Sequence, residues 1–93
     1  MLLCDVLIIG SGLAGLTSAL KLADHKKVLI VSKREILDSS SQWAQGGVAA
    51  VMSNEDSIES HVKDTEFVGG GLTDPKVANF VASHGKEAIE WLH

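Results

Sequence analysis

A glycine-rich turn near the N-terminus places the strongest constraint on how this chain folds. It has the pattern G-x-G-x-x-G and reads Gly10-Ser11-Gly12-Leu13-Ala14-Gly15. An apolar run at residues 4–9 precedes it, and apolar side chains then recur at three- and four-residue steps over about 13–24, as on one helix face. A second apolar run, 28–31, follows. This order predicts a βαβ unit over 4–32, with both strands buried in a parallel sheet, and therefore the α/β class.

The spacing of the glycines is typical of a turn that binds the pyrophosphate of a dinucleotide. In such a turn Gly10 allows a tight bend, Gly12 has no Cβ to obstruct a phosphate, and Gly15 lets the helix approach the strand. The amides and the partial positive charge at the start of the helix attract phosphates. A tight turn without a ligand is the plainer alternative. The position of the motif between a strand and a helix favours a dinucleotide site at residues 10–15.

The end of the second strand departs from the pattern of NAD-binding proteins. Those proteins carry Asp or Glu at this point, where the carboxylate accepts hydrogen bonds from ribose hydroxyls. This chain has Ser32 followed by Lys33, which counts against an NAD-dependent dehydrogenase. Ser32 can still form hydrogen bonds, and Lys33 can lie beside the adenine-side phosphate or ribose. Arg34 raises the alternative of NADP, through its 2′-phosphate, but a solvated surface arginine is the more favoured interpretation.

The rest of the chain predicts a long loop followed by helices. Residues 33–47 have no periodicity, and connections this long in compact domains are mostly functional. The run 48–52 is a candidate short strand, and a helix is expected over about 57–67. Asp74-Pro75 is a typical helix start, and the helix that follows carries a candidate kink or break at His84-Gly85. The helical part is expected over about 57–93, with no stop signal at its end, so the last element is expected to be cut.

The composition excludes several classes of partner. Twelve acidic and eight basic residues give a net charge of −4, and without a basic block no nucleic-acid partner is expected. No apolar run is long enough to cross a membrane, and the N-terminus lacks a signal-peptide pattern. The single Cys4 cannot form an internal disulfide, and the four histidines lack the paired spacing of metal ligands. We expect a cytoplasmic protein with no metal site and no membrane partner.

A second candidate binding segment lies in the long loop and reads Ser39-Ser40-Ser41-Gln42-Trp43-Ala44-Gln45-Gly46-Gly47. The two glycines let the main chain press against a flat ring, and their amides can donate to atoms that gain negative charge when a flavin is reduced. The hydroxyls of Ser40 and Ser41 and the Gln45 amide can satisfy ribityl and phosphate oxygens. Trp43 is equally suited to stacking on flavin or substrate and to a role in the core or in anchoring the loop. Taken alone, the serines would favour a flexible linker.

Together these segments resemble a known family. The runs C-D-V-L-I-I-G-S-G-L-A-G-L, V-S-K, S-S-Q-W-A-Q-G-G-V-A-A-V and D-S-I-E-S-H-V-K-D-T are similar to the N-terminal part of the L-aspartate oxidase family, within the succinate dehydrogenase and fumarate reductase flavoprotein superfamily. The resemblance covers essentially all 93 residues. Ser32-Lys33 is what this superfamily has at that place. The resemblance implies part of a Rossmann-like FAD-binding domain, with cofactor contacts from residues 10–15, 32–33 and 40–47.

The resemblance also implies an activity. Members of the family oxidise L-aspartate to iminoaspartate with FAD, pass the electrons to dioxygen or fumarate, and so begin quinolinate and NAD biosynthesis, with quinolinate synthase downstream. The groups that clamp the dicarboxylate come in this family from a capping domain and from chain beyond residue 93. No catalytic residue is therefore expected within 1–93, and this segment alone is expected to be inactive. A flavoprotein subunit of succinate dehydrogenase or fumarate reductase is one alternative, and a dinucleotide-binding module without chemistry is another.

The residue at position 40 indicates whether FAD is attached covalently. Membrane-bound respiratory members of the superfamily bond FAD covalently to a histidine just upstream of the A-Q-G-G segment, and the matching residue here is Ser40. A serine hydroxyl is far less nucleophilic at neutral pH than a neutral imidazole. The resemblance therefore implies that FAD is held non-covalently.

Overall fold

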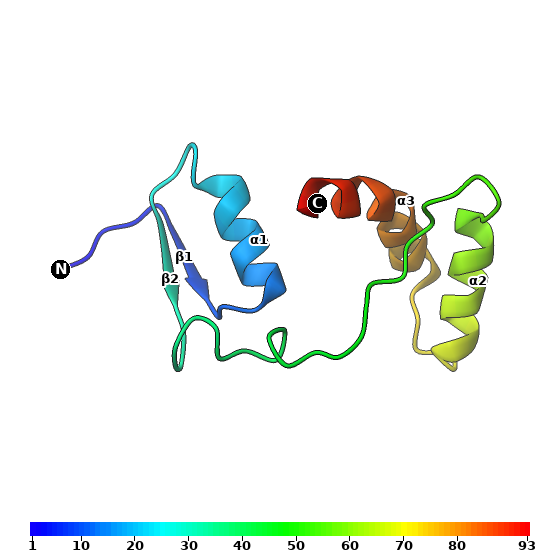
Figure 1. Cartoon of the computed structure of the whole chain (residues 1–93), viewed down its shortest axis with the longest axis horizontal. Coiled ribbons are helices and arrows are strands. Elements are labelled where there is room, and N and C mark those ends of the chain that lie inside the picture. The colour runs from blue at the N-terminus through cyan, green and yellow to red at the C-terminus, as the bar shows by residue number, and fades with distance from the viewer. The chain divides into compact units, whose positions relative to one another are not determined.

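The structure, a computed structural model, describes residues 1–93. The elements follow in the order β1 (Val6–Ile9), α1 (Leu13–Leu22), β2 (Val28–Val31), α2 (Ile58–Val68) and α3 (Pro75–Leu92). The chain divides into two compact units, unit 1 (Met1–Gly46) and unit 2 (Gly47–His93). Unit 1 holds a parallel sheet and α1, and unit 2 holds α2 and α3 (Figure 1). The predicted α/β class and the βαβ unit are confirmed.

Unit 1 is built on the parallel pairing of β1 with β2, in a register that places Ile9 opposite Val31. At the start of the pair, the Asp5 N–H donates to the Lys27 carbonyl at 2.8 Å, and the Lys27 N–H donates to Asp5 Oδ2 at 2.8 Å. At the other end, the Gly10 N–H donates to the Val31 carbonyl at 2.8 Å. Hydrogen bonds outside the strands therefore fix the register at both ends.

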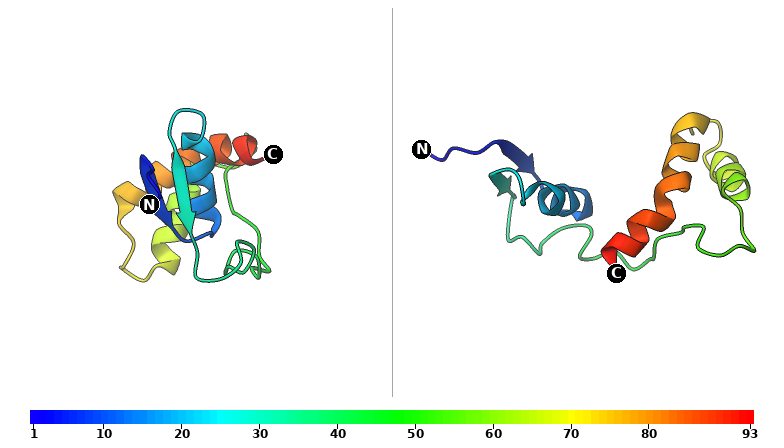
Figure 2. Two further views of the ribbon diagram at one scale, coloured as in Figure 1. Left: turned by 90° about the vertical axis from the view of Figure 1, so that its left-hand side faces the viewer. Right: turned by 90° about the horizontal axis from the view of Figure 1, so that it is seen from above.

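The helix α1 covers one face of this sheet (Figures 1 and 2). Ile8 points to the helix, since its Cγ2 lies 3.3 Å from the position that a Cβ on Gly15 would take. Leu7 and Ile9 alternate with Ile8 and lie on the other face, where they are 53% and 83% exposed. The prediction of strands buried on both faces is wrong for these residues, because unit 1 supplies one helix and that helix covers one face.

Unit 2 is a pair of helices that pack against each other, α2 and α3 (Figure 2). The Ser57 hydroxyl caps α2 by accepting the Ser60 N–H at 3.0 Å. Asp74 caps α3, where its Oδ1 accepts the N–H groups of Lys76 and Val77 at 2.8 and 3.3 Å. Side-chain caps satisfy amides that have no partner within a helix. The predicted helix start at Asp74-Pro75 is confirmed.

One prediction for unit 2 is wrong, and one of two alternatives is excluded. The candidate strand at 48–52 does not form, and the run is irregular chain. A strand needs a neighbour to pair with, and here the chain instead passes close to α3, where a Cβ on Gly85 would lie 3.4 Å from the Ala50 Cβ. The helix α3 is continuous through His84 and Gly85, so it has no break there. His84 Nδ1 lies 2.7 Å from the Phe80 carbonyl one turn earlier, a contact that a continuous helix brings about.

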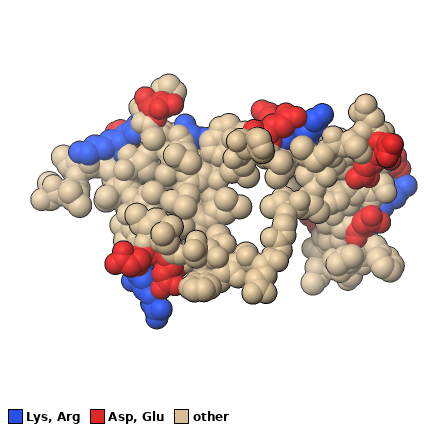
Figure 3. Space-filling model, in the orientation of Figure 1, with Lys and Arg blue, Asp and Glu red and all other residues tan.

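The charged side chains are distributed in small groups of both signs over the face shown in Figure 3. On α2, Lys63 Nζ lies 2.8 Å from Glu59 Oε1. This hydrogen bond, with the attraction of the two charges, lowers the pKa of Glu59 and raises the pKa of Lys63. None of the helices combines the length and the apolar character that crossing a membrane requires.

We predict that Asp74→Ala loosens the first turn of α3. The substitution removes the acceptor of the Lys76 and Val77 amides, and the loss of an Asp cap costs about 1 kcal/mol, which corresponds to roughly five-fold faster local exchange. Amide hydrogen exchange at these two residues measures the effect. Glu87→Ala, at an exposed position of the same helix, is the control and should leave both amides unchanged. Equal exchange in the two variants would contradict the capping role.

Candidate functional site

The glycine turn joins the end of β1 to the start of α1, and its backbone requires glycine at two positions. Gly10 has a φ of +113°, a conformation that L side chains rarely adopt. A Cβ on Gly15 would lie 2.3 Å from the Gly10 carbonyl oxygen, so a side chain there would collide with the turn. The conformational roles predicted for these residues, a tight bend and a close approach of helix to strand, are confirmed.

The second glycine of the motif, Gly12, meets a different requirement. Its φ of −73° and ψ of 179° are ordinary extended values that any residue adopts. A Cβ there would stand 3.4 Å from Ser41 Oγ, so the absence of a side chain keeps open the space above the turn. This space is where the fingerprint of dinucleotide-binding turns places the pyrophosphate. The turn therefore fits a dinucleotide such as FAD.

The first amides of α1 are suited to an anion. Gly12 is the N-cap residue and has no side chain to accept them, whereas Ser57 and Asp74 cap the other two helices. The first turn of α1 also carries no acidic residue. Amides at the start of a helix point outward and attract phosphate groups. The Leu13 N–H donates to Ser41 Oγ at 3.0 Å, and the cofactor contacts at Leu13 and Ala14 stay predictions.

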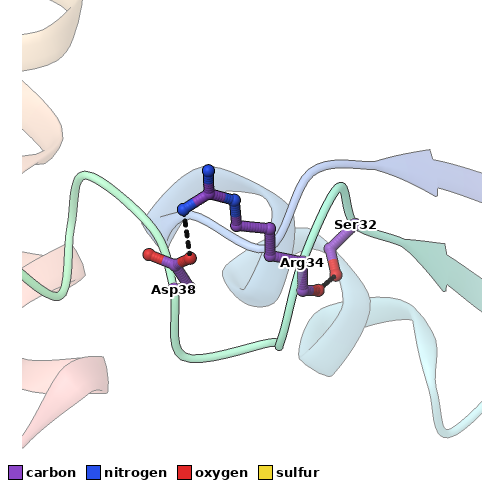
Figure 4. A network of polar contacts seen from close by, with 3 residues as sticks. All are labelled: Ser32, Arg34 and Asp38. Atoms are coloured by element: carbon purple, nitrogen blue, oxygen red, sulfur yellow. Dashed lines mark hydrogen bonds and ion pairs between the residues drawn. The ribbon is translucent and has the colours of Figure 1, made fainter.

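Ser32 and Lys33 leave β2 at the same sheet edge as the glycine turn, because the Gly10 N–H donates to Val31, the last residue of β2. The Ser32 hydroxyl donates to the Arg34 carbonyl (Figure 4). A hydroxyl has two lone pairs besides its hydrogen, so Ser32 Oγ can still accept hydrogen bonds from ribose hydroxyls. The two residues stay predictions as cofactor contacts, and their place at this edge suits the adenosine side of a dinucleotide.

Arg34 is paired within the loop. Its Nη1 lies 3.3 Å from Asp38 Oδ2, four residues further along the chain (Figure 4). The sequence reasoning missed Asp38, although opposite charges four residues apart are a recognisable signal for pairing. A guanidinium beside a carboxylate attracts another anion less, which counts against an NADP 2′-phosphate at Arg34.

The long loop reaches the glycine turn at Ser41. Its Oγ accepts the Leu13 N–H at 3.0 Å, across 28 positions of sequence. Two of the predicted segments, residues 10–15 and 40–47, are thus in contact at this hydroxyl.

The remaining loop residues lie at the surface. Trp43 is 75% exposed, so neither the core role nor the loop-anchoring role considered for it is observed. An open hollow of about 490 Å³ is lined by Lys33, Arg34, Asp38, Ser39, Ser40 and Trp43. The other residues predicted to contact the flavin are all exposed: Gln42, Ala44, Gln45, Gly46 and Gly47. Their flavin contacts stay predictions.

A family model described as an FAD binding domain matches residues 5–93. The chain belongs to this FAD-binding domain family. The match includes the glycine turn, the end of β2 and the long loop, which are the segments that sequence and geometry single out. FAD, the cofactor predicted from the sequence, is confirmed.

The similar curated proteins include several L-aspartate oxidases. L-aspartate oxidase 1 of Ralstonia nicotianae and L-aspartate oxidase of Pseudomonas aeruginosa are each 51% identical over 88 residues, which make up 95% of this chain and 16% of each relative. A solved structure of an E. coli quinol fumarate reductase variant matches with a TM-score of 0.89 and 33% identity, over 96% of this chain and 16% of that chain. The resemblance to the flavoprotein superfamily is confirmed, and the chain spans 16% of the length of these relatives.

We predict that Gly12→Val in the complete protein abolishes FAD binding and leaves the fold largely intact. Valine tolerates the extended backbone at this position, but its methyl groups would enter the space above the turn where the pyrophosphate is expected. The flavin absorption spectrum and the ratio of flavin to purified protein measure binding, and circular dichroism measures the fold. Gly85→Ala on α3 is the glycine control and should bind flavin normally. A folded Gly12→Val protein with full flavin content would show that the turn is only structural.

Proposed function

We propose that this chain is the N-terminal FAD-binding part of an L-aspartate oxidase. The whole enzyme would oxidise L-aspartate to iminoaspartate and pass the electrons from FAD to dioxygen or fumarate, as the first step of quinolinate and NAD biosynthesis. The observation that carries the proposal is the 51% identity to L-aspartate oxidases over 95% of the chain. The glycine turn between β1 and α1, whose backbone requires glycine at Gly10 and Gly15, supports it.

Within that enzyme the three segments have separate tasks. Residues 4–32 form the βαβ unit, whose turn receives the pyrophosphate at the amides of α1, and Ser32 and Lys33 lie towards the adenosine side. The flavin loop, residues 33–47, lies along the ribityl chain and the isoalloxazine ring. The helical part, residues 57–93, completes this portion of the domain. FAD, when bound, supplies the acceptor for the hydride from Cα of the substrate.

The residues of this chain hold the cofactor and do not carry out the chemistry on the substrate. Recognition of a dicarboxylate requires cationic or histidine side chains that face one another across a site. We expect no such pair of side chains among residues 1–93. In the proposed enzyme these groups come from other parts of the protein, so L-aspartate is the substrate of the whole and not a ligand of this segment.

A flavoprotein subunit of a fumarate reductase is the second candidate. It is favoured by the TM-score of 0.89 to the E. coli quinol fumarate reductase variant, over 96% of this chain. The sequence identity of that match is 33%, against 51% for the L-aspartate oxidases over a similar length. A shared fold is common to the whole superfamily, so the higher identity favours the oxidase.

We predict that L-aspartate, and not succinate, reduces the flavin of the complete protein. Anaerobic mixing with each acid, followed by the loss of flavin absorbance, measures reduction, and peroxide formation in air measures turnover. Residues 1–93 alone should give no peroxide above a blank without protein, since they lack the groups that bind the substrate. Bleaching by succinate and none by L-aspartate would replace the proposal with the second candidate. Peroxide from L-aspartate with residues 1–93 alone would contradict the assignment of the substrate groups to other parts.

We predict that acid denaturation releases all the FAD of the complete protein. Ser40, at the position of the histidine that bonds FAD covalently in respiratory relatives, offers no equivalent nucleophile. After denaturation and filtration, the yellow colour should pass into the filtrate. A respiratory relative with covalent flavin, treated in the same way, is the control and should retain its flavin on the polypeptide. Flavin fluorescence that stays on the denatured chain would overturn non-covalent attachment.

A further inference from the structure

A reciprocal set of hydrogen bonds joins Asp5, just before β1, to Lys27, just before β2. The Lys27 N–H donates to Asp5 Oδ2 at 2.8 Å. The Lys27 carbonyl accepts the N–H groups of Asp5 and Val6 at 2.8 and 3.3 Å. The main chain of Lys27 is therefore held through both its donor and its acceptor, and the Asp5 carboxylate is the one side-chain group in this link.

Lys27 is also the last residue of the connection by which the chain leaves α1 and returns to the start of the sheet (Figure 1). The helix ends at Leu22, whose carbonyl accepts the N–H groups of His25 and Lys26 at 3.0 and 2.9 Å. These bonds tie the connection to the last turn of the helix. The link from Lys27 to Asp5 thus fixes the C-terminal end of α1 relative to the start of β1.

The other end of α1 is fixed at the glycine turn. A Cβ on Gly15 would lie 2.3 Å from the Gly10 carbonyl oxygen, so the first turn of the helix lies directly against the end of β1. Burial between the two ends is sparse, because Ala19 is the buried residue of α1 while Leu13 and Leu20 are exposed. The direction of the helix on the sheet therefore depends strongly on how its two ends are held.

We propose that Asp5 is a positioning residue for the diphosphate of FAD, although it lies at the opposite end of the sheet from the glycine turn. Its carboxylate holds the C-terminal end of α1 and so sets the direction in which the first amides of the helix point. Without this bond the helix can tilt about its contact at Gly15, and the amides meet phosphate oxygens at poorer angles. The inference rests on the proposed placement of FAD at this turn.

The proposed role predicts an effect on cofactor affinity as well as on folding. A helix that is held in one direction by the fold has less freedom to lose when a ligand binds to its amides. A helix that can tilt must be ordered by the cofactor itself, and the cost of that ordering weakens binding. The diphosphate is the part of FAD that should report the change.

Four variants of the complete protein test this role. Asp5→Ala removes the acceptor of the Lys27 amide, whereas Asp5→Asn keeps an oxygen at the same place without the charge. Asp5→Ser, whose oxygen lies one bond closer to the backbone, is the milder change if Asp5→Ala does not fold. Asp24→Ala is the matched control, because it removes an equal charge from the turn after α1.

Three quantities are measured for each variant. They are the FAD dissociation constant of the flavin-free protein, the phosphorus NMR resonances of FAD bound at saturation, and the free energy of unfolding. We expect Asp5→Ala to weaken FAD binding by about five-fold, the effect of one hydrogen bond of ordinary strength. It should also shift the phosphorus resonances of bound FAD, and Asp5→Ser should shift them in the same direction. Asp5→Asn should restore the affinity and the resonances, and Asp24→Ala should match the wild type.

Two results would overturn the proposal. The first is a lower free energy of unfolding in Asp5→Ala or Asp5→Ser with unchanged phosphorus resonances, which would make the role of Asp5 purely structural. The second is wild-type FAD affinity in Asp5→Ala, or an equal loss of affinity in Asp5→Asn, since the hydrogen bond would then not be the cause.

These outcomes are separate from the proposed activity. A protein that binds FAD and shows the Asp5 effects, but does not oxidise L-aspartate, would retain the positioning role and lose the proposed substrate. A protein that oxidises L-aspartate and is indifferent to Asp5→Ala would retain the substrate and lose the positioning role.

Discussion

The close contact between the first turn of α1 and the end of β1 is the constraint on which the candidate site depends. A Cβ on Gly15 would stand 2.3 Å from the Gly10 carbonyl oxygen, so the helix can approach this closely only without a side chain. The contact sets where the first amides of α1 point. The hydrogen bond from Gly10 to Val31 brings β2 to the same edge. The approach of helix to strand and the parallel pairing together bring the first amides of α1 to the same edge of the sheet as Ser32, where the dinucleotide is proposed to bind.

Much of the chain's apolar surface is exposed to solvent. Ala19 and Ala82 are the buried apolar residues, and Leu7 and Ile9 on the back of the sheet are exposed. Large exposed apolar surfaces usually mark interaction sites or parts of a larger core. Local hydrogen bonds therefore do much to fix where the helices and strands begin and end. They are the caps at Ser57 and Asp74 and the bonds at the two ends of the strand pair. This agrees with a chain that spans 16% of the length of its relatives.

Hydroxyl groups stand at the positions where related sites use charged or more nucleophilic side chains. Ser32 follows the second strand, where NAD-binding proteins carry a carboxylate, and the resemblance to the flavoprotein superfamily implies that Ser40 stands where respiratory members carry the histidine bonded to flavin. A hydroxyl can accept and donate hydrogen bonds without bringing a charge near the diphosphate. Three serines, Ser32, Ser40 and Ser41, thus offer a site that holds a dinucleotide by hydrogen bonds, which is the attachment proposed for FAD.

The sequence by itself determined the features that depend on neighbouring residues. The glycine spacing and the apolar periodicity predicted the βαβ unit, and Asp74-Pro75 predicted the start of α3, because backbone conformation and helix caps are set within a few positions. Residues 48–52 have the composition of a strand, but only the tertiary structure decides whether a strand has a partner to pair with. The contact of Ser41 with Leu13 and the exposed back of the sheet were likewise decided there. Both depend on which segments, distant in sequence, come into contact, and a local sequence pattern does not predict such contacts.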